Sequence, residues 1–459
     1  GREIPSSTRS FRPAEAGQDL VLTLDESLQY ETEQILLNEA NLAQAKDATA
    51  VIVDVHTGDV LAMATVEGPT PTQPAHVADA TERNRPLTDV FEPGSTNKVI
   101  TMAGALEDGA VKPDQRFTIP SEMHVGGQVY TDDEPHGTLQ MGLSDIMARS
   151  SNLGTIQVAA KLGAGRFDHY LRAFGLGKKT SVRFPGQEAG LLLPLSSYNS
   201  TSMGSMPIGQ GIAVTSLQML DAYLTIANGG VSVNPRLVDA TIDASGHRHE
   251  VPVTRGTRVV SAQTARLVTQ MLAGVVSRSD GTGTAAAIPG YAVAGKTGTA
   301  RKPPYNLNQH VASFVGFAPA NAPRLAISVV IDQPTTKYYG GEVAAPAFAG
   351  IMQNALRVVG VPPDTGVAVP PLYFQQQAKV WGTTTTTGVP GSTTTTTPGA
   401  TTPSSATTGP AAAGLSGPTP PDSGPVSPSG AGATVGSTPT TGARAGPAGT
   451  LTGAASPSG

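Results

Sequence analysis

The chain has 459 residues, contains no cysteine and carries a formal net charge of −5 at pH 7. The lack of cysteine excludes disulfides, thiol catalysis and thiolate metal sites, and it fits a protein exported by a bacterium. The slightly acidic balance, without any basic block, argues against nucleic-acid binding. No apolar run in the sequence approaches the length of a membrane span, and no signal peptide is visible.

The first part of the sequence predicts a strand, a long helix and a β-hairpin. Residues 20–24 alternate as a strand does, and Asp25 is placed to cap a helix that runs to about residue 45. The residues expected on the buried side of this helix are Leu28, Ile35, Leu36 and Leu42. Two β-rich runs, 48–55 and 60–65, then flank the turn sequence His-Thr-Gly-Asp.

The rest of the ordered part reads first as helices and then as strands. A polar loop at 69–86 and an irregular stretch at 110–137 are expected. Helices are expected at 143–148, 153–162, 166–174, 213–227, 263–276 and 347–359, and strands at 291–294, 311–318 and 325–331. This order predicts an α+β, sandwich-like fold, in which an antiparallel sheet is flanked by helices and the first and last elements meet.

The composition changes completely at about residue 382. Thr, Pro, Gly, Ser and Ala dominate from there to the end, and only Asp422 and Arg444 are charged. A segment with so little apolar surface to bury is expected to be disordered. A wall-spanning spacer, a glycosylated stalk and an unselected flexible tail all fit this composition.

The stretch Phe91-Glu-Pro-Gly-Ser95-Thr-Asn-Lys98 places a hydroxyl and an amine three residues apart. It opens an apolar helix that we expect to run from Ser95 to Gly109. Residues i and i+3 share one face of a helix, so we expect the Lys98 amine to reach the Ser95 hydroxyl. The helix N-terminus favours developing negative charge, as an activated nucleophile requires. The pattern is short and common, and Ser95 as a helix cap beside a solvated Lys98 also explains it.

A second motif, Ser150-Ser-Asn152, falls in a loop between two predicted helices. There a serine hydroxyl and a side-chain amide can both project into a cleft. The same residue types also cap helices, which is the alternative explanation for Ser150 and Asn152.

A third motif, Lys296-Thr-Gly-Thr299, ends a predicted strand. The lysine and both threonine hydroxyls can line one edge there, while Gly298 allows close backbone approach; a plain strand edge and turn is the alternative. The preceding glycines also complete a phosphate-loop pattern over 290–297. That loop must open a helix, which Gly298 and two following prolines prevent, so nucleotide binding is not expected.

Taken together, Ser-x-x-Lys, Ser-x-Asn and Lys-Thr-Gly, about 50 and 150 residues apart, are the motif set of penicillin-interacting serine enzymes. The middle motif departs from the usual Ser-Asp-Asn in having Ser151. Over about residues 17–359 the chain resembles a class B (monofunctional) penicillin-binding protein, a peptidoglycan D,D-transpeptidase, and most of all the septal cell-division enzymes. The resemblance extends to the runs Ala50–Ala64, Asn84-Arg85, Glu92-Pro-Gly94, Gly209-Gln-Gly211 and Ser313–Pro319. It implies the transpeptidase fold shared with serine β-lactamases.

The resemblance implies four catalytic residues. Ser95 would be the acylated nucleophile and Lys98 its base. Ser150 would relay a proton towards the leaving group, with Lys296 as electrostatic support. A lysine of ordinary pKa is a poor base at neutral pH, so the pKa of Lys98 must be lowered by burial or by a second cation, for which Lys296 is the candidate.

The same resemblance implies the substrate-binding residues. Asn152 would hold the substrate's amide, and Thr297 and Thr299 would bind its terminal carboxylate on either side of Gly298. The backbone N–H groups of Ser95 and Thr299 would form the oxyanion hole. The substrate would be the D-Ala-D-Ala end of a peptidoglycan stem peptide, with β-lactams acylating the same serine. No metal or cofactor is implied.

The family organisation predicts four segments: 1–24 as the remnant of an N-terminal pedestal domain, 25–360 as the transpeptidase domain, 361–381 as a linker and 382–459 as the disordered tail. The catalytic domain would lie outside the bacterial cell membrane, on an N-terminal anchor that this chain does not contain. Expected partners are a glycosyltransferase that uses lipid-linked precursors and the proteins of the division machinery.

Two other functions fit the same three motifs. A serine β-lactamase or D,D-carboxypeptidase would send the acyl group to water instead of an amine. A degenerate transpeptidase would serve as a scaffold or a β-lactam sensor without turnover.

Overall fold

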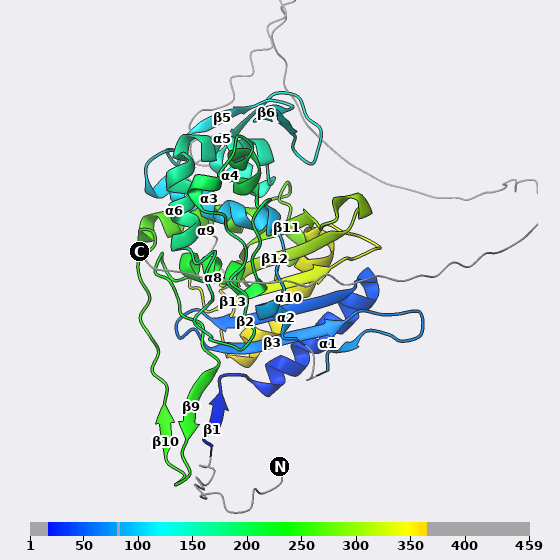
Figure 1. The fold of residues 1–459 in the computed structure, drawn as a ribbon, viewed down its shortest axis with the longest axis vertical. Coiled ribbons are helices and arrows are strands. Elements are labelled where there is room, and N and C mark those ends of the chain that lie inside the picture. Colours follow the sequence, from blue (N-terminus) through cyan, green and yellow to red (C-terminus); the bar gives the residue numbers. More distant parts are fainter. Residues whose placement is uncertain (1–16, 80–82, 365–459) are drawn as a thin grey trace, which may run out of the picture. The chain divides into compact units, whose positions relative to one another are not determined.

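A six-stranded antiparallel sheet in the order β11-β12-β13-β2-β3-β4 forms the centre of the computed structural model, which describes residues 17–79 and 83–364 (Figure 1). The strands are β2 (Asp47–Asp54), β3 (Val60–Glu67), β4 (His76–Val77), β11 (Ala294–Arg301), β12 (His310–Ala318) and β13 (Leu325–Asp332). β2 pairs with β13, so that Asp47 lies opposite Asp332. The early and late parts of the chain therefore meet in mid-sheet, as predicted.

Helices cover both faces of this sheet. α1 (Glu26–Ala43) and α10 (Gly340–Val358) pack on one face, and α8 (Ser216–Ala227) and α9 (Ala262–Ser277) pack on the other. Val51 belongs to the hydrophobic core on the α8–α9 side, and Ile52 belongs to the core on the α1–α10 side. Because consecutive strand residues point to opposite faces, β2 is apolar on both. The predicted antiparallel sheet flanked by helices is confirmed.

A group of helices extends the core on the α8–α9 side (Figure 1). They are α3 (Lys98–Glu107), α4 (Leu143–Ala148), α5 (Asn152–Leu162) and α6 (Ala164–Ala173). The shorter helical pieces are α2 (Arg85–Thr88), α7 (Ser202–Ser205), and the 3₁₀ turns η1 (Gly94–Asn97), η2 (Leu195–Ser197), η3 (Met206–Ile208), η4 (Thr284–Ala286) and η5 (Tyr305–Leu307). Among the helices of residues 17–79 and 83–364, none combines the length and apolarity that crossing a bilayer requires.

Within the part of the chain that the structure describes, three small sheets lie apart from the central one. β1 (Asp19–Leu22) and β10 (Arg248–Glu250) flank β9 (Val238–Ile242), β5 (Arg116–Ile119) pairs with β8 (Leu139–Gly142), and β6 (Met123–Val125) pairs with β7 (Gln128–Tyr130). The irregular stretch expected at 110–137 is therefore wrong. These strands have three or four residues and are partly exposed, so even the alternation of β5 is too short to predict a strand by itself.

Most of the expected elements are present, but some bounds differ. The strand expected at 291–294 is observed as β11, at 294–301, and the helix expected from residue 213 begins at Ser216. Asp25 caps α1 by accepting the N–H of Leu28 at 2.9 Å, as predicted. Leu42, however, is 63% exposed. Each residue turns a helix by about 100°, and the buried side is centred on Thr32, Glu39 and Ala43, which leaves Leu42 beside it. α10 begins seven residues before the predicted start, so that Pro346 lies inside the helix.

The predicted segments are covered to different extents. The segment 1–24 is described only from Gly17, where β1 joins the small sheet with β9. The linker at 361–381 is described only as far as Asp364, whose carboxylate accepts the N–H of Ala292 at 3.1 Å. The tail at 382–459 lies outside the described residues.

Candidate active site

Ser95 lies on the tight 3₁₀ turn η1, and the α-helix α3 begins only at Lys98. The helix expected from Ser95 onward therefore starts three residues later. Gly94 just before it has φ +53°, and its N–H donates to the carbonyl of Gly209 at 3.0 Å. A Cβ on Gly94 would lie 3.1 Å from the carbonyl oxygen of Thr299, so the turn is seated directly on β11.

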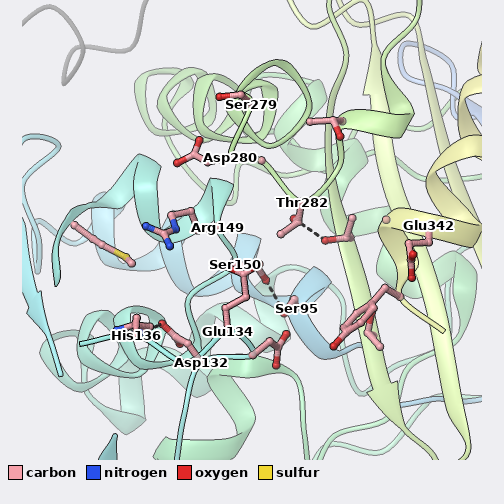
Figure 2. Close-up of a pocket in the computed structure, with 18 residues that line it drawn as sticks. Ser95, Asp132, Glu134, His136, Arg149, Ser150, Ser279, Asp280, Thr282 and Glu342 are labelled. Atoms are coloured by element: carbon pink, nitrogen blue, oxygen red, sulfur yellow. Dashed lines mark hydrogen bonds and ion pairs between the residues drawn. The ribbon is translucent and has the colours of Figure 1, made fainter. Parts of the chain in front are cut away.

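Lys98 is fully buried at the start of α3. Its Nζ donates to the Ser150 carbonyl at 2.6 Å, the Ser150 hydroxyl at 3.3 Å and Asn152 Oδ1 at 2.7 Å. The hydrogen bonds from the Lys98 amine to described residues thus go to Ser150 and Asn152, and not directly to the Ser95 hydroxyl. Ser150 Oγ donates in turn to Ser95 Oγ at 2.9 Å (Figure 2). Ser150 therefore connects the lysine to the serine.

The loop between α4 and α5 is shaped by Ser150 and Ser151. Ser150 has φ +58°, a left-handed conformation that costs a side chain about 1 kcal/mol. Ser151 caps α5 by accepting the N–H of Gly154 at 2.9 Å. Since Ser151 is the cap, the flanking side chains of Ser150 and Asn152 are free to bind Lys98, which favours the functional interpretation of this motif over capping.

Asp132 holds this loop from outside and was not identified from the sequence. Its Oδ2 accepts from the hydroxyl of Ser151 at 2.7 Å, and its Oδ1 accepts from the N–H of Leu153 at 2.9 Å. The adjacent carbonyl of Thr131 accepts from Asn152 Nδ2 at 3.1 Å. The acidic run at 132–134 is visible in the sequence, but only the fold shows which carboxylate reaches the motif.

The third motif lies inside β11, and not at a strand end as predicted. Gly298 permits the close approach that the sequence predicted: a Cβ there would lie 2.3 Å from Ser313 Oγ and 3.0 Å from the carbonyl of Pro93. The phosphate-loop pattern that precedes it leads into this strand and opens no helix. Thr299 Oγ1 accepts the N–H of Gly340 at 3.0 Å, which ties β11 to the start of α10.

Lys296 is fully buried within β11. Its Nζ donates to Thr297 Oγ1 at 3.0 Å, to the carbonyl of Thr297 at 3.2 Å and to Thr282 Oγ1 at 3.4 Å. These are its hydrogen bonds to described residues, and none of them goes to Ser150. Thr282, from the loop after α9, is a second residue of the site that the sequence motifs did not reveal.

The three motifs meet at a cavity of about 560 Å³ (Figure 2). Of the predicted residues, Ser95, Ser150, Thr297 and Thr299 line it, while Lys98, Asn152, Lys296 and Gly298 are not among its lining residues. The guanidinium of Arg149 and the imidazole of His136 also line it, together with five carboxylates: Asp132, Asp133, Glu134, Asp280 and Glu342. Within 17–79 and 83–364, no group of three or more acidic, histidine or cysteine side chains is arranged to hold a metal ion.

Burial lowers the pKa of both lysines. For Lys98 it lowers the pKa to about 8, although Asp133 and Asp132 partly offset this. For Lys296 burial lowers the pKa well below its ordinary value, and the positive charge of Lys98 lowers it further. Burial is thus the main cause of the lowered pKa of Lys98. The effect of a second cation is on Lys296, whose pKa is lowered by the charge of Lys98.

The family model described as the penicillin binding protein transpeptidase domain matches residues 48–353. The chain belongs to this family. The penicillin-binding protein PbpB of Mycolicibacterium smegmatis is 38% identical over 390 residues, which cover 82% of this chain and 60% of PbpB. The protein named "Probable peptidoglycan D,D-transpeptidase PenA" of Neisseria flavescens is 34% identical over 352 residues, or 76% of this chain and 84% of PenA.

Solved structures agree with the family assignment. Penicillin-binding protein 3 from Mycobacterium tuberculosis, complexed with ampicillin, superimposes with a TM-score of 0.72 at 36% identity. The match covers 79% of this chain and 83% of that one. The transpeptidase fold expected from the resemblance is confirmed. The chain spans 60% and 57% of the length of two mycobacterial PbpB relatives.

Proposed function

We propose that the chain is a peptidoglycan D,D-transpeptidase that works through an acyl-enzyme on Ser95. The observation that carries this proposal is the continuous set of contacts from Lys98 Nζ to Ser150 Oγ at 3.3 Å and from Ser150 Oγ to Ser95 Oγ at 2.9 Å. A buried amine that is linked to an accessible serine is the arrangement needed to activate a nucleophile. The membership of the penicillin-binding transpeptidase family supports the same reaction.

The contacts define a path for the proton. Ser95 Oγ attacks the carbonyl of the D-Ala-D-Ala peptide bond, and its proton passes through Ser150 to the neutral amine of Lys98. With the pKa of Lys98 at about 8, about a tenth of this lysine is neutral at pH 7. The proton returns through Ser150 to the leaving nitrogen as the C–N bond breaks. The amine of a neighbouring stem peptide then displaces Ser95 and forms the cross-link.

We assign substrate binding to Asn152, Thr297 and Thr299. Asn152 Oδ1 accepts from Lys98, and Asn152 Nδ2 donates to the carbonyl of Thr131. These two bonds set the orientation of the side-chain amide. Thr299 Oγ1 already accepts from Gly340, which leaves its proton for the substrate's carboxylate. Thr297 adds a second hydroxyl, and the backbone N–H groups of Ser95 and Thr299 serve as the oxyanion hole.

Mass spectrometry after exposure to benzylpenicillin tests the proposal. We expect one stable adduct, on the peptide that contains Ser95, and its loss in Ser95→Ala. Ser279→Ala, which removes another hydroxyl from the same cavity, is the matched control and should still be labelled. Rapid hydrolysis without an adduct would indicate a β-lactamase, and an intact fold without any adduct would indicate a scaffold.

A second assay separates transpeptidation from carboxypeptidation. A stem peptide that ends in D-Ala-D-Ala is incubated with and without an amino-acid acceptor. A transpeptidase yields the cross-linked product when the acceptor is present, whereas a carboxypeptidase yields the shortened acid in both cases.

The cellular setting is part of the same proposal. We assign the chain to septal wall synthesis, outside the bacterial cell membrane, with a glycosyltransferase and division proteins as partners. Support comes from the family and from relatives such as the stage V sporulation protein D of Bacillus subtilis, 32% identical over 380 residues. The proposed transpeptidase domain, 25–360, contains the whole family match at 48–353. Fluorescent-penicillin labelling of cells that make this protein, concentrated at the septum and lost in Ser95→Ala, is the expected result; uniform wall labelling would contradict the septal role.

A further inference from the structure

Thr282 stands where three elements of the site meet. It follows α9 in the loop before η4, and its N–H donates to the carbonyl of Ala148, the last residue of α4, at 3.0 Å. A Cβ on Gly341, in the first turn of α10, would lie 2.3 Å from the Thr282 carbonyl oxygen. These two contacts fix its backbone, while its exposed side chain lines the cavity that contains Ser95 (Figure 2).

The hydroxyl of Thr282 forms a pair with that of Thr297, since their Oγ1 atoms are 2.9 Å apart. Lys296 Nζ donates to both oxygens, at 3.4 Å to Thr282 and at 3.0 Å to Thr297. Because the lysine amine is the donor in both contacts, each hydroxyl oxygen already accepts a hydrogen bond. Among the described residues, the two hydroxyl protons make only one hydrogen bond, the one that joins the two threonines.

A carboxylate that enters the cavity can replace the hydrogen bond between the two hydroxyls. A carboxylate accepts hydrogen bonds and donates none, so it can take the protons of both hydroxyls in place of their mutual bond. The arriving anion also favours the charged form of Lys296, and the charged amine then stabilises that anion. The geometry needs no movement of the backbone, because Thr282 is already held beside β11.

We propose that Thr282 is a third hydroxyl of the carboxylate-binding site, beside Thr297 and Thr299, and that it selects substrates with a free terminal carboxylate. This role rests on the proposed acyl transfer at Ser95 and extends it to a residue outside the three motifs. A purely structural role, in which Thr282 only ties its loop to β11, predicts a different pattern of loss, because the nature of the substrate's end would not matter.

The test compares two thioester donors that differ only at their end, one with a free carboxylate and one with its methyl ester. Thr282→Val is expected to lower kcat/KM for the carboxylate at least about tenfold, as befits a lost hydrogen bond to a charged group. The methyl ester should change less than twofold. Thr282→Ser, which keeps the hydroxyl, should restore the carboxylate rate to within about threefold.

Thr284→Val is the matched control, since Thr284 lines the same cavity two residues away. It should leave both donors near the wild-type rates, and thermal unfolding should show all variants folded. An equal loss for both donors in Thr282→Val, or no loss for the carboxylate, overturns the role of Thr282 while an active wild type upholds the proposed function. A wild type that processes neither thioester and takes up no benzylpenicillin overturns the proposed function, and the role of Thr282 with it.

Discussion

Ser150 donates its hydroxyl to that of Ser95 across 2.9 Å from a left-handed backbone, with φ +58°. This conformation turns the chain sharply between α4 and α5, and it lets both the hydroxyl and the carbonyl of Ser150 meet Lys98. A residue with a Cβ avoids this region unless its surroundings enforce it. The strain therefore lies at the point where Ser95, Ser150 and Lys98 come together.

The first prediction distinguishes the effect of the Ser150 backbone conformation from the effect of its hydroxyl. Ser150→Ala and Ser150→Gly should both slow acylation by benzylpenicillin about 100-fold or more, because each removes the proton path. Ser150→Gly should be more stable than Ser150→Ala by about 1 kcal/mol, because glycine adopts positive φ without strain. Stopped-flow labelling with fluorescent penicillin and urea unfolding measure the two effects. Equal stabilities, or wild-type acylation in either variant, would contradict this account.

The pH dependence of acylation should follow the protonation of Lys98. Its pKa of about 8 means that the neutral base grows as pH rises, so the rate should increase with pH and level off above about 8. Asp133 favours the charged form of Lys98. Asp133→Asn should therefore shift the rising limb of the pH–rate profile to lower pH without abolishing acylation. A limb that stays in place or moves to higher pH would exclude Lys98 as the titrating base.

Asp132 should matter to both stability and rate, although it is not part of any motif. Its carboxylate accepts from the Ser151 hydroxyl and from the N–H of Leu153. Asp132→Ala leaves these donors unpaired, which should cost about 1–3 kcal/mol in the free energy of unfolding and slow acylation about tenfold. A double-mutant cycle with Ser151→Ala should show coupling between the two residues. Additive losses would mean that the Asp132–Ser151 contact does not position the loop.

Glu39, buried on α1 and remote in sequence from the motifs, should make stability depend on pH. Burial raises its pKa from 4.5 to about 7. The folded state thus keeps a proton that the unfolded state releases, so the stabilisation is complete below about pH 4.5 and is lost as pH rises through 7. Glu39→Gln should be about 2–3 kcal/mol more stable than wild type at pH 8 and nearly equal at pH 4.5.

Urea unfolding at the two pH values checks this, with Glu31→Gln on the same helix as the control. The half-exposed Glu31 should give little difference at either pH. A gain from Glu39→Gln that is the same at both pH values would point to packing instead of charge.

The sequence predicted elements well where the local signal was strong. α4 was placed at its observed bounds, and Asp25 was recognised as the cap of α1, because periodicity and capping are local properties. The strands at 116–130 were missed because they are short and partly exposed. Leu42 was placed in the core because its apolar character was weighed above its angle on the helix.

The candidate site shows the same division. The motifs identified Ser95, Ser150 and Lys296, but the sequence could not show that the amine of Lys98 turns towards Ser150, because this contact joins residues 52 positions apart. Asp132 and Thr282 carried no pattern of their own. Only the folded chain brings a loop carboxylate to α5 and a loop hydroxyl to β11, so such residues escape motif-based prediction.

The pairing of β2 with β13 has a consequence for synthesis of the chain. The hairpin β2–β3 emerges early, yet its other sheet partner begins at Leu325, and the strand on which the Ser95 turn is seated begins at Ala294. A nascent or truncated chain that stops before residue 294 contains Ser95 and Lys98 without the β11 wall of the site. Such a chain has an open sheet edge and lacks Thr297 and Thr299. Under the proposed function, it would therefore gain penicillin reactivity only when its last strands arrive.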